Sequence, residues 1–271
     1  MTRYELGIIG AGNMAEAIAR GVLRAKLFRP DQLVAADVAP ARRELFTREL
    51  GVRAVEANEE VARQSRVLLL SVKPQQMAQA LAGIGAALDP AALVVSIAAG
   101  VRSASIEKHL GGGRAWRVVR TMPNTPMLVG EGMSAIARGA NATAADLATA
   151  RRMFESAGAV VEVGEDKMDA VTALSGSGPA YVFYLAEHMI AAGVEMGFAP
   201  EQARQLAIKT VVGAAKMLDT SSDTPQELRR KVTSPGGTTQ AAITRLESAH
   251  FGPALVQAIL AAERRGKELS A

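Results

Sequence analysis

The sequence lacks cysteine altogether and has only three histidines among its 271 residues. Without thiols, the chain has no route to disulfides, to thiolate catalysis or to cysteine-ligated zinc. The histidines His109, His188 and His250 lie far apart in the sequence, and we assign none of them a catalytic role. We therefore expect no metal site in this protein.

Aromatic side chains and excess charge are also scarce. Phe, Trp and Tyr make up 4% of the residues, and 31 Lys and Arg against 27 Asp and Glu leave a net charge of +4. The basic residues occur in short clusters, such as Arg229-Arg230-Lys231, rather than in a long stripe. Nucleic-acid binding needs a concentrated basic surface and often aromatic platforms for the bases, so the composition argues against a nucleic-acid partner.

Long hydrophobic runs are absent as well. The longest apolar stretch, from Ala91 to Val101, is about half as long as a membrane-spanning helix and is interrupted by Ser96. The N-terminus has a single Arg and leads directly into a strand-like segment, which is unlike a secretory signal peptide. We expect a cytoplasmic protein with no membrane partner.

Apolar residues, at 49% of the chain, occur in the first half as short continuous runs between helical stretches. Such runs are typical of strands that are buried on both faces of a parallel sheet. The helical stretches extend from Asn13 to Lys26 and, after the second run, through Leu50. We predict the α/β class, with a Rossmann-type doubly wound sheet. Its expected strands are Leu6–Ile9, Leu33–Ala36, Val67–Val72, Leu93–Ile97 and Arg117–Val119.

The second half has no convincing strand after Val163, and its apolar residues recur at helical spacing. We expect residues 1–165 to form a dinucleotide-binding Rossmann domain and residues 166–271 to form an all-helical domain. Helices that are apolar around most of their circumference must be buried on several sides. A homodimer that packs through this half is therefore expected, with a monomeric bundle as the alternative. The helices are expected at Pro179–Met196, Pro200–Leu218, Thr239–Glu247 and Pro253–Leu269.

A glycine-rich turn, Gly10-Ala11-Gly12-Asn13-Met14-Ala15, follows the first expected strand and opens the first helix. This is the G-x-G-x-x-A pattern of dinucleotide-binding folds, in the strand–turn–helix context that the pattern requires. Gly10 allows the tight turn, Gly12 lets the backbone approach a pyrophosphate, and Ala15 lets the helix pack close to the strand. The helix N-terminus favours the phosphate charge. A tight turn without a ligand is the alternative.

Asp37 ends the second expected strand, 37 − 15 = 22 residues after Ala15. An acidic residue at this place usually accepts hydrogen bonds from the ribose hydroxyls and favours NAD over NADP. Arg42 and Arg43 follow closely and could instead accept a 2′-phosphate, which leaves the cofactor as NADP or NAD. A further alternative is that Asp37 only caps the next helix.

Further candidate cofactor-binding residues follow the later strands, because ligands of open α/β sheets lie beyond the carboxyl ends of the strands. Small residues there let a nicotinamide ring approach the backbone. Lys73 is placed either to bond a ribose hydroxyl or to lie in solvent, and Asn124 offers a donor and an acceptor. The candidates are Ser71, Val72, Lys73 and Pro74 in one loop, Ala98, Ala99 and Gly100 in the next, and Asn124 in a third.

Two loops of the second half combine glycines with hydroxyl residues immediately before a helix. They are Ser175-Gly-Ser-Gly-Pro-Ala-Tyr181 and Thr233-Ser-Pro-Gly-Gly-Thr-Thr239. Free N–H groups at a helix start, together with hydroxyls, can bind an anion. A helix cap that packs against a neighbouring helix is the alternative for each loop.

In combination, these segments resemble the pyrroline-5-carboxylate reductase family. The resemblance covers nearly the whole chain, because six motifs occur in the order of that family. They are Ile9-Gly-Ala-Gly-Asn-Met14, Ser71-Val-Lys-Pro74, Ser96-Ile-Ala-Ala-Gly100, Met122-Pro-Asn-Thr-Pro126, Ser175–Tyr181 and Thr233–Thr239. Two positions depart from the family's pattern: Lys231 stands where some relatives have Asn, and Asp37 stands where members with a strong NADP preference have an uncharged residue.

The resemblance implies an oxidoreductase that reduces L-1-pyrroline-5-carboxylate to L-proline with NADPH or NADH, the final step of proline biosynthesis. It implies a homodimer, or a larger ring of dimers, with active sites built from both subunits. Thr239 would be the catalytic hydroxyl near the imine nitrogen. Cofactor-binding residues would be Ile9, Gly10, Ala11, Gly12, Asn13 and Met14 with the strand-end residues named above. The substrate would contact Ser175, Ser234, Gly236, Gly237, Thr238 and Thr239.

The chemistry of this reaction suits a sequence without cysteine and with little histidine. A cyclic imine can arrive already protonated, so the enzyme needs a well-placed hydride donor and a carboxylate site more than a strong acid. A related two-domain dehydrogenase of imines or hydroxy acids is one alternative, although the helix from Pro179 onward begins without the Lys that such enzymes usually need. A non-catalytic dinucleotide-binding protein is the other.

Overall fold

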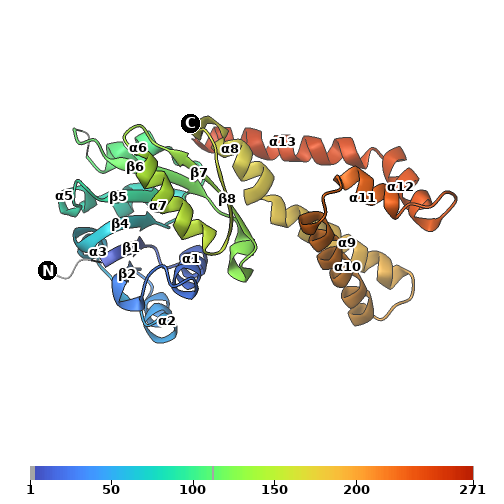
Figure 1. Cartoon of the computed structure of the whole chain (residues 1–271), viewed down its shortest axis with the longest axis horizontal. Helices are drawn as coiled ribbons and strands as arrows, with labels where there is room; N and C mark the ends of the chain where they lie inside the picture. The colour runs from blue at the N-terminus through green and yellow to red at the C-terminus, as the bar shows by residue number, and fades with distance from the viewer. Residues whose placement is uncertain (1–3, 112, 271) are drawn as a thin grey trace. The chain divides into compact units, whose positions relative to one another are not determined.

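The computed structural model describes residues 4–111 and 113–270. One sheet of eight strands organises the first part of the chain, in the order β3-β2-β1-β4-β5-β6-β7-β8. Figure 1 labels these strands except β3. Neighbouring strands are parallel except for the antiparallel pair β6 and β7. The strands are β1 (Tyr4–Ile9), β2 (Leu33–Ala36), β3 (Arg53–Val55), β4 (Ser65–Leu70), β5 (Leu93–Ser96), β6 (Arg117–Met122), β7 (Gly132–Arg138) and β8 (Gly158–Glu162).

Helices connect the strands and form the rest of the chain. Those among the strands are α1 (Asn13–Arg24), α2 (Pro40–Leu50), α3 (Asn58–Gln64), α4 (Met77–Leu81), α5 (Ile84–Ala87), α6 (Ser103–His109) and α7 (Ala144–Glu155). Those after the sheet are α8 (Met168–Val171), α9 (Gly178–Glu195), α10 (Pro200–Thr220), α11 (Pro225–Lys231), α12 (Thr238–Ser248) and α13 (Phe251–Ser270). Short 3₁₀ turns are η1 (Pro30–Gln32), η2 (Pro74–Gln76), η3 (Thr125–Val129) and η4 (Glu165–Lys167), and η5 (Thr172–Gly176) is a π-helix.

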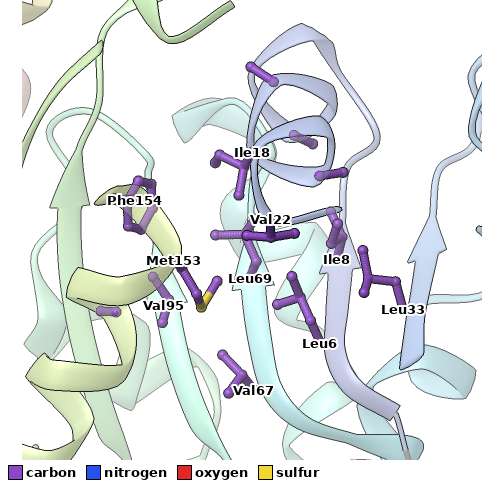
Figure 2. Close-up of a cluster of buried hydrophobic side chains, with 14 of the residues drawn as sticks. Leu6, Ile8, Ile18, Val22, Leu33, Val67, Leu69, Val95, Met153 and Phe154 are labelled. Carbon is purple, nitrogen blue, oxygen red and sulfur yellow. The ribbon is translucent and has the colours of Figure 1, made fainter. Parts of the chain in front are cut away.

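Alternate residues of the central strands bury their side chains on opposite faces of the sheet, as the period of a strand requires. Leu6, Ile8, Val67 and Leu69 pack on the face that α1 and α7 cover, where Figure 2 shows them around Val22 and near Met153. The residues next to them in the sequence pack on the other face with α3 to α6. Burial on both faces explains the continuous apolar runs and confirms the doubly wound sheet.

The strand expectations were incomplete at the edges of the sheet. Three strands, β3, β7 and β8, were not expected. β3 has only three residues, and β8 lies at the sheet edge with mostly exposed residues, so neither has a continuous apolar run. β7 is the strand next to this edge, and Ser134 interrupts its apolar residues. The expected strand from Val67 to Val72 ends at Leu70, because Ser71 already belongs to the loop of the candidate site.

The contacts of the chain divide it into two compact units. The first contains the residues up to Ser177 together with those from Ala262 onward, and the second is Gly178–Ala261. The helix α13 therefore begins in the second unit and ends in the first, where Ser270 Oγ donates a hydrogen bond to Asp169 Oδ1 at 2.7 Å. This division follows contacts within one chain, and the functional boundary expected near residue 165 stays a prediction.

The second unit consists of helices, as expected, and includes the short α11 that the sequence analysis did not anticipate. The helices α9 and α10 pack closely where Gly193 faces Ala203, since a Cβ on Gly193 would lie 2.8 Å from the Cβ of Ala203. None of the helices in residues 4–111 and 113–270 is both long and apolar enough to cross a membrane.

Candidate functional site

The glycine-rich turn joins β1 to α1 with two glycines that face different surroundings. Gly10 has φ +89°, and its N–H donates to the carbonyl of Ala36 at 2.8 Å. A Cβ on Gly10 would lie 2.8 Å from the carbonyl oxygen of Ser71, whereas a Cβ on Gly12 would meet nothing within 4 Å. Gly10 therefore permits close packing of two loops, and Gly12 leaves open space at the N-terminus of α1.

A cavity of about 600 Å³ opens beside this turn at the carboxyl ends of β1, β2 and β4. Gly10 and Gly12 line it, with Asp37 from the β2 end and Ser71 to Lys73 from the β4 end. This is the place where an open α/β sheet binds a dinucleotide. The open space at Gly12 fits a pyrophosphate, which the free N–H groups of the first turn of α1 can receive.

Asp37 links the glycine-rich turn to the start of α2. Its Oδ2 accepts a hydrogen bond from the N–H of Ala11 at 2.7 Å, and its Oδ1 accepts one from the N–H of Ala39 at 2.8 Å. Ala39 is the N-cap residue of α2, so Asp37 bonds the residue before the helix and makes no cap bond to the helix itself. The same carboxylate also lines the cavity, which keeps it available to a ribose hydroxyl.

The two arginines after β2 already have partners in the protein. Arg42 donates from Nε to the carbonyl of Ala11 at 2.5 Å and from Nη2 to Glu16 at 2.9 Å. Arg43 donates from Nη1 to the carbonyls of Asp37 and Val38 at 2.8 and 3.0 Å. Burial raises the pKa of Glu16, but the hydrogen bonds from Arg42 and Arg20 outweigh it, and the net shift of this pKa is downward.

The loops after β4 and β5 continue the site. The N–H of Ser71 donates to the carbonyl of Ile9 at 2.8 Å, which holds the β4 loop against the glycine-rich turn. Lys73 is exposed at the cavity wall, where its ammonium can reach a bound ligand. Ala98 is buried, and Gly100 has φ +74°. Pro74, Ala99 and Gly100 line a second cavity of about 670 Å³ in the first unit.

Asn124 lies in the same unit but is tied to backbone groups. Its Nδ2 donates to the carbonyl of Ser175 at 3.1 Å, and its Oδ1 accepts from the N–H of Met133 at 2.8 Å. The side chain is only 9% exposed. Asn124 therefore positions the π-helix that contains Ser175, and its direct contact with a cofactor stays a prediction.

The loop before α12 belongs to the second unit and leads directly into the first turn of that helix. Gly236 has φ +73°, and Gly237 is the N-cap residue of α12 with extended backbone. Thr238 and Thr239 are the first residues of the helix, so their N–H groups have no partner within it. Thr239 is half-buried and Ser234 is exposed. The roles assigned to these residues stay predictions.

Sequence reasoning missed several polar residues of the first cavity. Asn58, Gln76 and Gln79 line it, and none was a candidate. Asn58 opens α3 directly after β3, so it would have been found only if that short strand had been recognised. Gln76 ends the 3₁₀ turn that Pro74 begins, and Gln79 lies in α4, a short helix that the sequence did not predict.

Two family models match separate stretches of this chain. Residues 165–269 match a family model described as pyrroline-5-carboxylate reductase dimerisation, and residues 5–100 match one described as NADP oxidoreductase, coenzyme F420-dependent. The second match covers the glycine-rich turn and the strand ends that line the first cavity. The chain is thus an oxidoreductase by family, with a site for NAD(P).

Relatives and solved structures cover the full length. The pyrroline-5-carboxylate reductase of Synechocystis is 43% identical over 266 residues, 98% of each chain, and that of Pseudomonas aeruginosa is 41% identical, over 100% of this chain and 98% of its own. The structure of the Coxiella burnetii pyrroline-5-carboxylate reductase covers 100% of both chains with a TM-score of 0.90 and 34% identity. The Plasmodium falciparum enzyme with NADP bound gives a TM-score of 0.88 and 31% identity over 100% of both chains. This chain belongs to the pyrroline-5-carboxylate reductase family.

Proposed function

We propose that this chain reduces L-1-pyrroline-5-carboxylate to L-proline with NADPH or NADH, the final step of proline biosynthesis. The observation behind the proposal is the turn Ser234–Thr239, which presents glycines, hydroxyls and the N-terminus of α12 together. A dinucleotide-binding protein without catalysis has no use for this second anion-binding turn. The substrate has a carboxylate that such a turn binds well.

The first unit supplies the cofactor residues of the proposal. Gly12, Asn13 and Met14 present the first N–H groups of α1 to the pyrophosphate, and Lys73 bonds a ribose hydroxyl from the cavity wall. Ala98 to Gly100 give the nicotinamide room beside the backbone. The bound dinucleotide supplies the hydride.

The second unit supplies the substrate residues. The N–H groups of Thr238 and Thr239, which have no partner within α12, receive the carboxylate, and the hydroxyl of Ser234 completes its hydrogen bonds. The contact of Ser175, a residue of the first unit, with the substrate stays a prediction. Thr239 holds its hydroxyl at the ring nitrogen, where it fixes the orientation of the imine and can relay a proton. Positioning of the ring accounts for most of the rate, since correct placement of reacting atoms is worth several kcal/mol of the barrier.

The helical unit supports a homodimer. Only Ala186, Gly193, Ala203 and Ala207 are buried among its described residues in a single chain. Many large apolar side chains are exposed, and so extended an apolar surface is typical of a subunit interface. They include Val182, Phe183, Tyr184, Leu185, Leu206, Val212, Met217 and Val256. A ring of dimers and a cytoplasmic location stay predictions.

The test follows absorbance at 340 nm with purified full-length protein, pyrroline-5-carboxylate, and NADPH or NADH in parallel. Oxidation of either cofactor is expected. Thr239→Val should lower kcat by about 10²-fold while the Kd of the cofactor is unchanged. Thr149→Val is the matched control, because Thr149 is a half-buried threonine of α7 that does not line the first cavity, and its hydroxyl donates to the carbonyl of Ala145.

Three outcomes would contradict the proposal. Unchanged turnover of Thr239→Val removes the role of that hydroxyl. Cofactor binding without oxidation, in protein shown to be folded and dimeric, supports the non-catalytic alternative. Oxidation with other cyclic imines or turnover of hydroxy acids, but not with pyrroline-5-carboxylate, supports the related dehydrogenase alternative.

A further inference from the structure

The proposed function leaves open which dinucleotide the chain prefers. NADP differs from NAD only in a phosphate on the adenine ribose 2′-oxygen, and such a group has a charge of about −1.5 to −2 at neutral pH. A site that accepts it usually presents an arginine near the end of β2, and a site that rejects it presents a carboxylate. This chain has both an arginine and a carboxylate near the end of β2. The contacts that these side chains make therefore determine whether the site accepts or rejects the 2′-phosphate.

The carboxylate of Asp37 is fixed at the cavity wall. It accepts hydrogen bonds from the N–H groups of Ala11 and Ala39, on two different loops. These bonds hold the negative charge beside the space where the ribose of a dinucleotide lies. Swinging the carboxylate away from a 2′-phosphate would leave two backbone N–H groups without their acceptor.

Arg42 is held away from that space by Glu16. The guanidinium bonds the carbonyl of Ala11 through Nε and the carboxylate of Glu16 through Nη2, and Arg42 does not line the cavity. The two side chains are 24% and 17% exposed, so solvent screens their attraction less than it would at an open surface. Arg43 is held in a similar way, by the carbonyls of Asp37 and Val38 and by Glu56 at 3.4 Å.

Glu16 has a second partner that steadies it. Its Oε1 accepts a hydrogen bond from Arg20 Nε at 2.9 Å, one turn along α1, and Arg20 also pairs with Glu49 of α2. Bonds from two arginines therefore hold the carboxylate of Glu16 in place beside Arg42. Its position in the first turn of α1 also suits a negative charge.

We propose that Glu16 is a positioning residue that sets the cofactor preference of this chain. Glu16 holds Arg42 on the glycine-rich turn, so this arginine does not reach a 2′-phosphate on the adenine ribose. The carboxylate of Asp37 also repels that phosphate directly. The chain then binds NADH in preference to NADPH. The inference rests on the dinucleotide site of the proposed function, and it does not depend on the identity of the reduced substrate.

Binding of two nucleotides tests the inference without catalysis. Calorimetric titration of the full-length protein with 5′-AMP and with 2′,5′-ADP gives the ratio of their Kd values, which isolates the 2′-phosphate. For the wild type we expect 5′-AMP to bind more tightly. Glu16→Gln should improve the affinity for 2′,5′-ADP relative to 5′-AMP by about fivefold, because it frees Arg42 to contact the 2′-phosphate. Asp37→Ser should improve it by about tenfold, because it removes a negative charge that repels this phosphate.

Glu49→Gln is the matched control. It removes the same charge from the same side of the molecule and releases the same Arg20, but Glu49 does not contact Arg42. Its nucleotide ratio should equal that of the wild type. In the Arg42→Gln background, Glu16→Gln should have no effect on the ratio, because the residue through which Glu16 acts is gone. This second comparison still tests the inference if Glu16→Gln alone lowers stability.

Several results would overturn the inference. They are a wild type that binds 2′,5′-ADP more tightly, a Glu49→Gln variant that shifts the ratio as much as Glu16→Gln, and a Glu16 effect that persists without Arg42. If neither nucleotide binds, the inference fails together with the dinucleotide site. If the ratio changes as expected but pyrroline-5-carboxylate is not reduced, only the proposed reaction fails. In an active enzyme, Glu16→Gln should lower the KM for NADPH relative to NADH and leave kcat unchanged.

Discussion

Alanine substitutions at Gly10 and Gly12 should separate the two requirements that the glycine-rich turn combines. At Gly10, alanine would have to adopt φ +89°, and its Cβ would lie 2.8 Å from the carbonyl oxygen of Ser71 and 2.9 Å from the Val72 Cγ1. At Gly12, φ is −72°, and the Cβ would point into open space. The first change strains the folded protein, and the second occupies the space proposed for the pyrophosphate.

The magnitudes differ accordingly. For Gly10→Ala, the left-handed backbone costs ~1–2 kcal/mol and the overpacking against a backbone carbonyl a further ~1–3 kcal/mol. The reduced entropy of the unfolded chain offsets ~0.4–1 kcal/mol of this, which leaves a loss of roughly 1–5 kcal/mol in the free energy of unfolding. For Gly12→Ala, the same gain in the unfolded state nearly offsets the poorer N-cap, so the net change is within about 1 kcal/mol.

Urea unfolding and calorimetric binding of NADH measure the two effects separately. Gly10→Ala should unfold at lower urea concentration with an unchanged slope. Gly12→Ala should unfold like the wild type and bind NADH at least about tenfold more weakly, since the methyl group blocks close approach of the backbone to the pyrophosphate. A Gly10→Ala protein of wild-type stability would refute the packing argument, and a Gly12→Ala protein of wild-type affinity would refute the placement of the ligand.

Two further predictions concern buried polar groups of the first unit. Burial, and next the charge of Glu165, raise the pKa of Glu107, so the native state holds the proton to higher pH than the unfolded state and loses stability as the pH rises. Glu107→Gln should therefore raise the midpoint of thermal unfolding at pH 7, and raise it less at pH 4. An equal rise of the midpoint at both pH values would contradict the raised pKa of Glu107. Asn124→Ala should lower the free energy of unfolding by about 1–3 kcal/mol, because the carbonyl of Ser175 and the N–H of Met133 lose their partner. Urea unfolding checks this value, and a loss below that of an exposed Asn141→Ala control would contradict the positioning role.

The sequence predicted the parts of the fold that local pattern determines. The turn from Ile9 to Ala15 fixes one strand, one loop and one helix, since its glycines suit few other arrangements. The runs before Ser71 and Ile97 are continuous because both faces of the sheet are covered. β7 was missed because Ser134, though buried, is a polar residue in the middle of its apolar run. Burial of a small hydroxyl depends on tertiary packing and leaves no local pattern.

The sequence predicted where the candidate site lies better than it predicted which side chains contact one another there. The strand-end loops follow from the topology, so Gly10, Asp37 and Lys73 were correctly expected near one another. The hydrogen-bond partners of Asp37 and Arg42 could not be predicted, because the contacts of a flexible side chain depend on how the neighbouring loops fold. Glu16 was overlooked for the same reason: an acidic residue in the first turn of a helix is ordinary by itself.

The path of α13 has a consequence for how the chain folds during synthesis. Gly178–Ala261 is, in topological terms, an insertion within the first unit, whose last residues come from the end of the chain. The ribosome adds about 5–20 residues each second, so the strands around the dinucleotide cavity emerge well before Ser270 can reach Asp169. The first unit is therefore completed only after the residues from Ala262 to Ser270 have been synthesised. Deletion of these residues thus acts on the unit that contains the dinucleotide cavity.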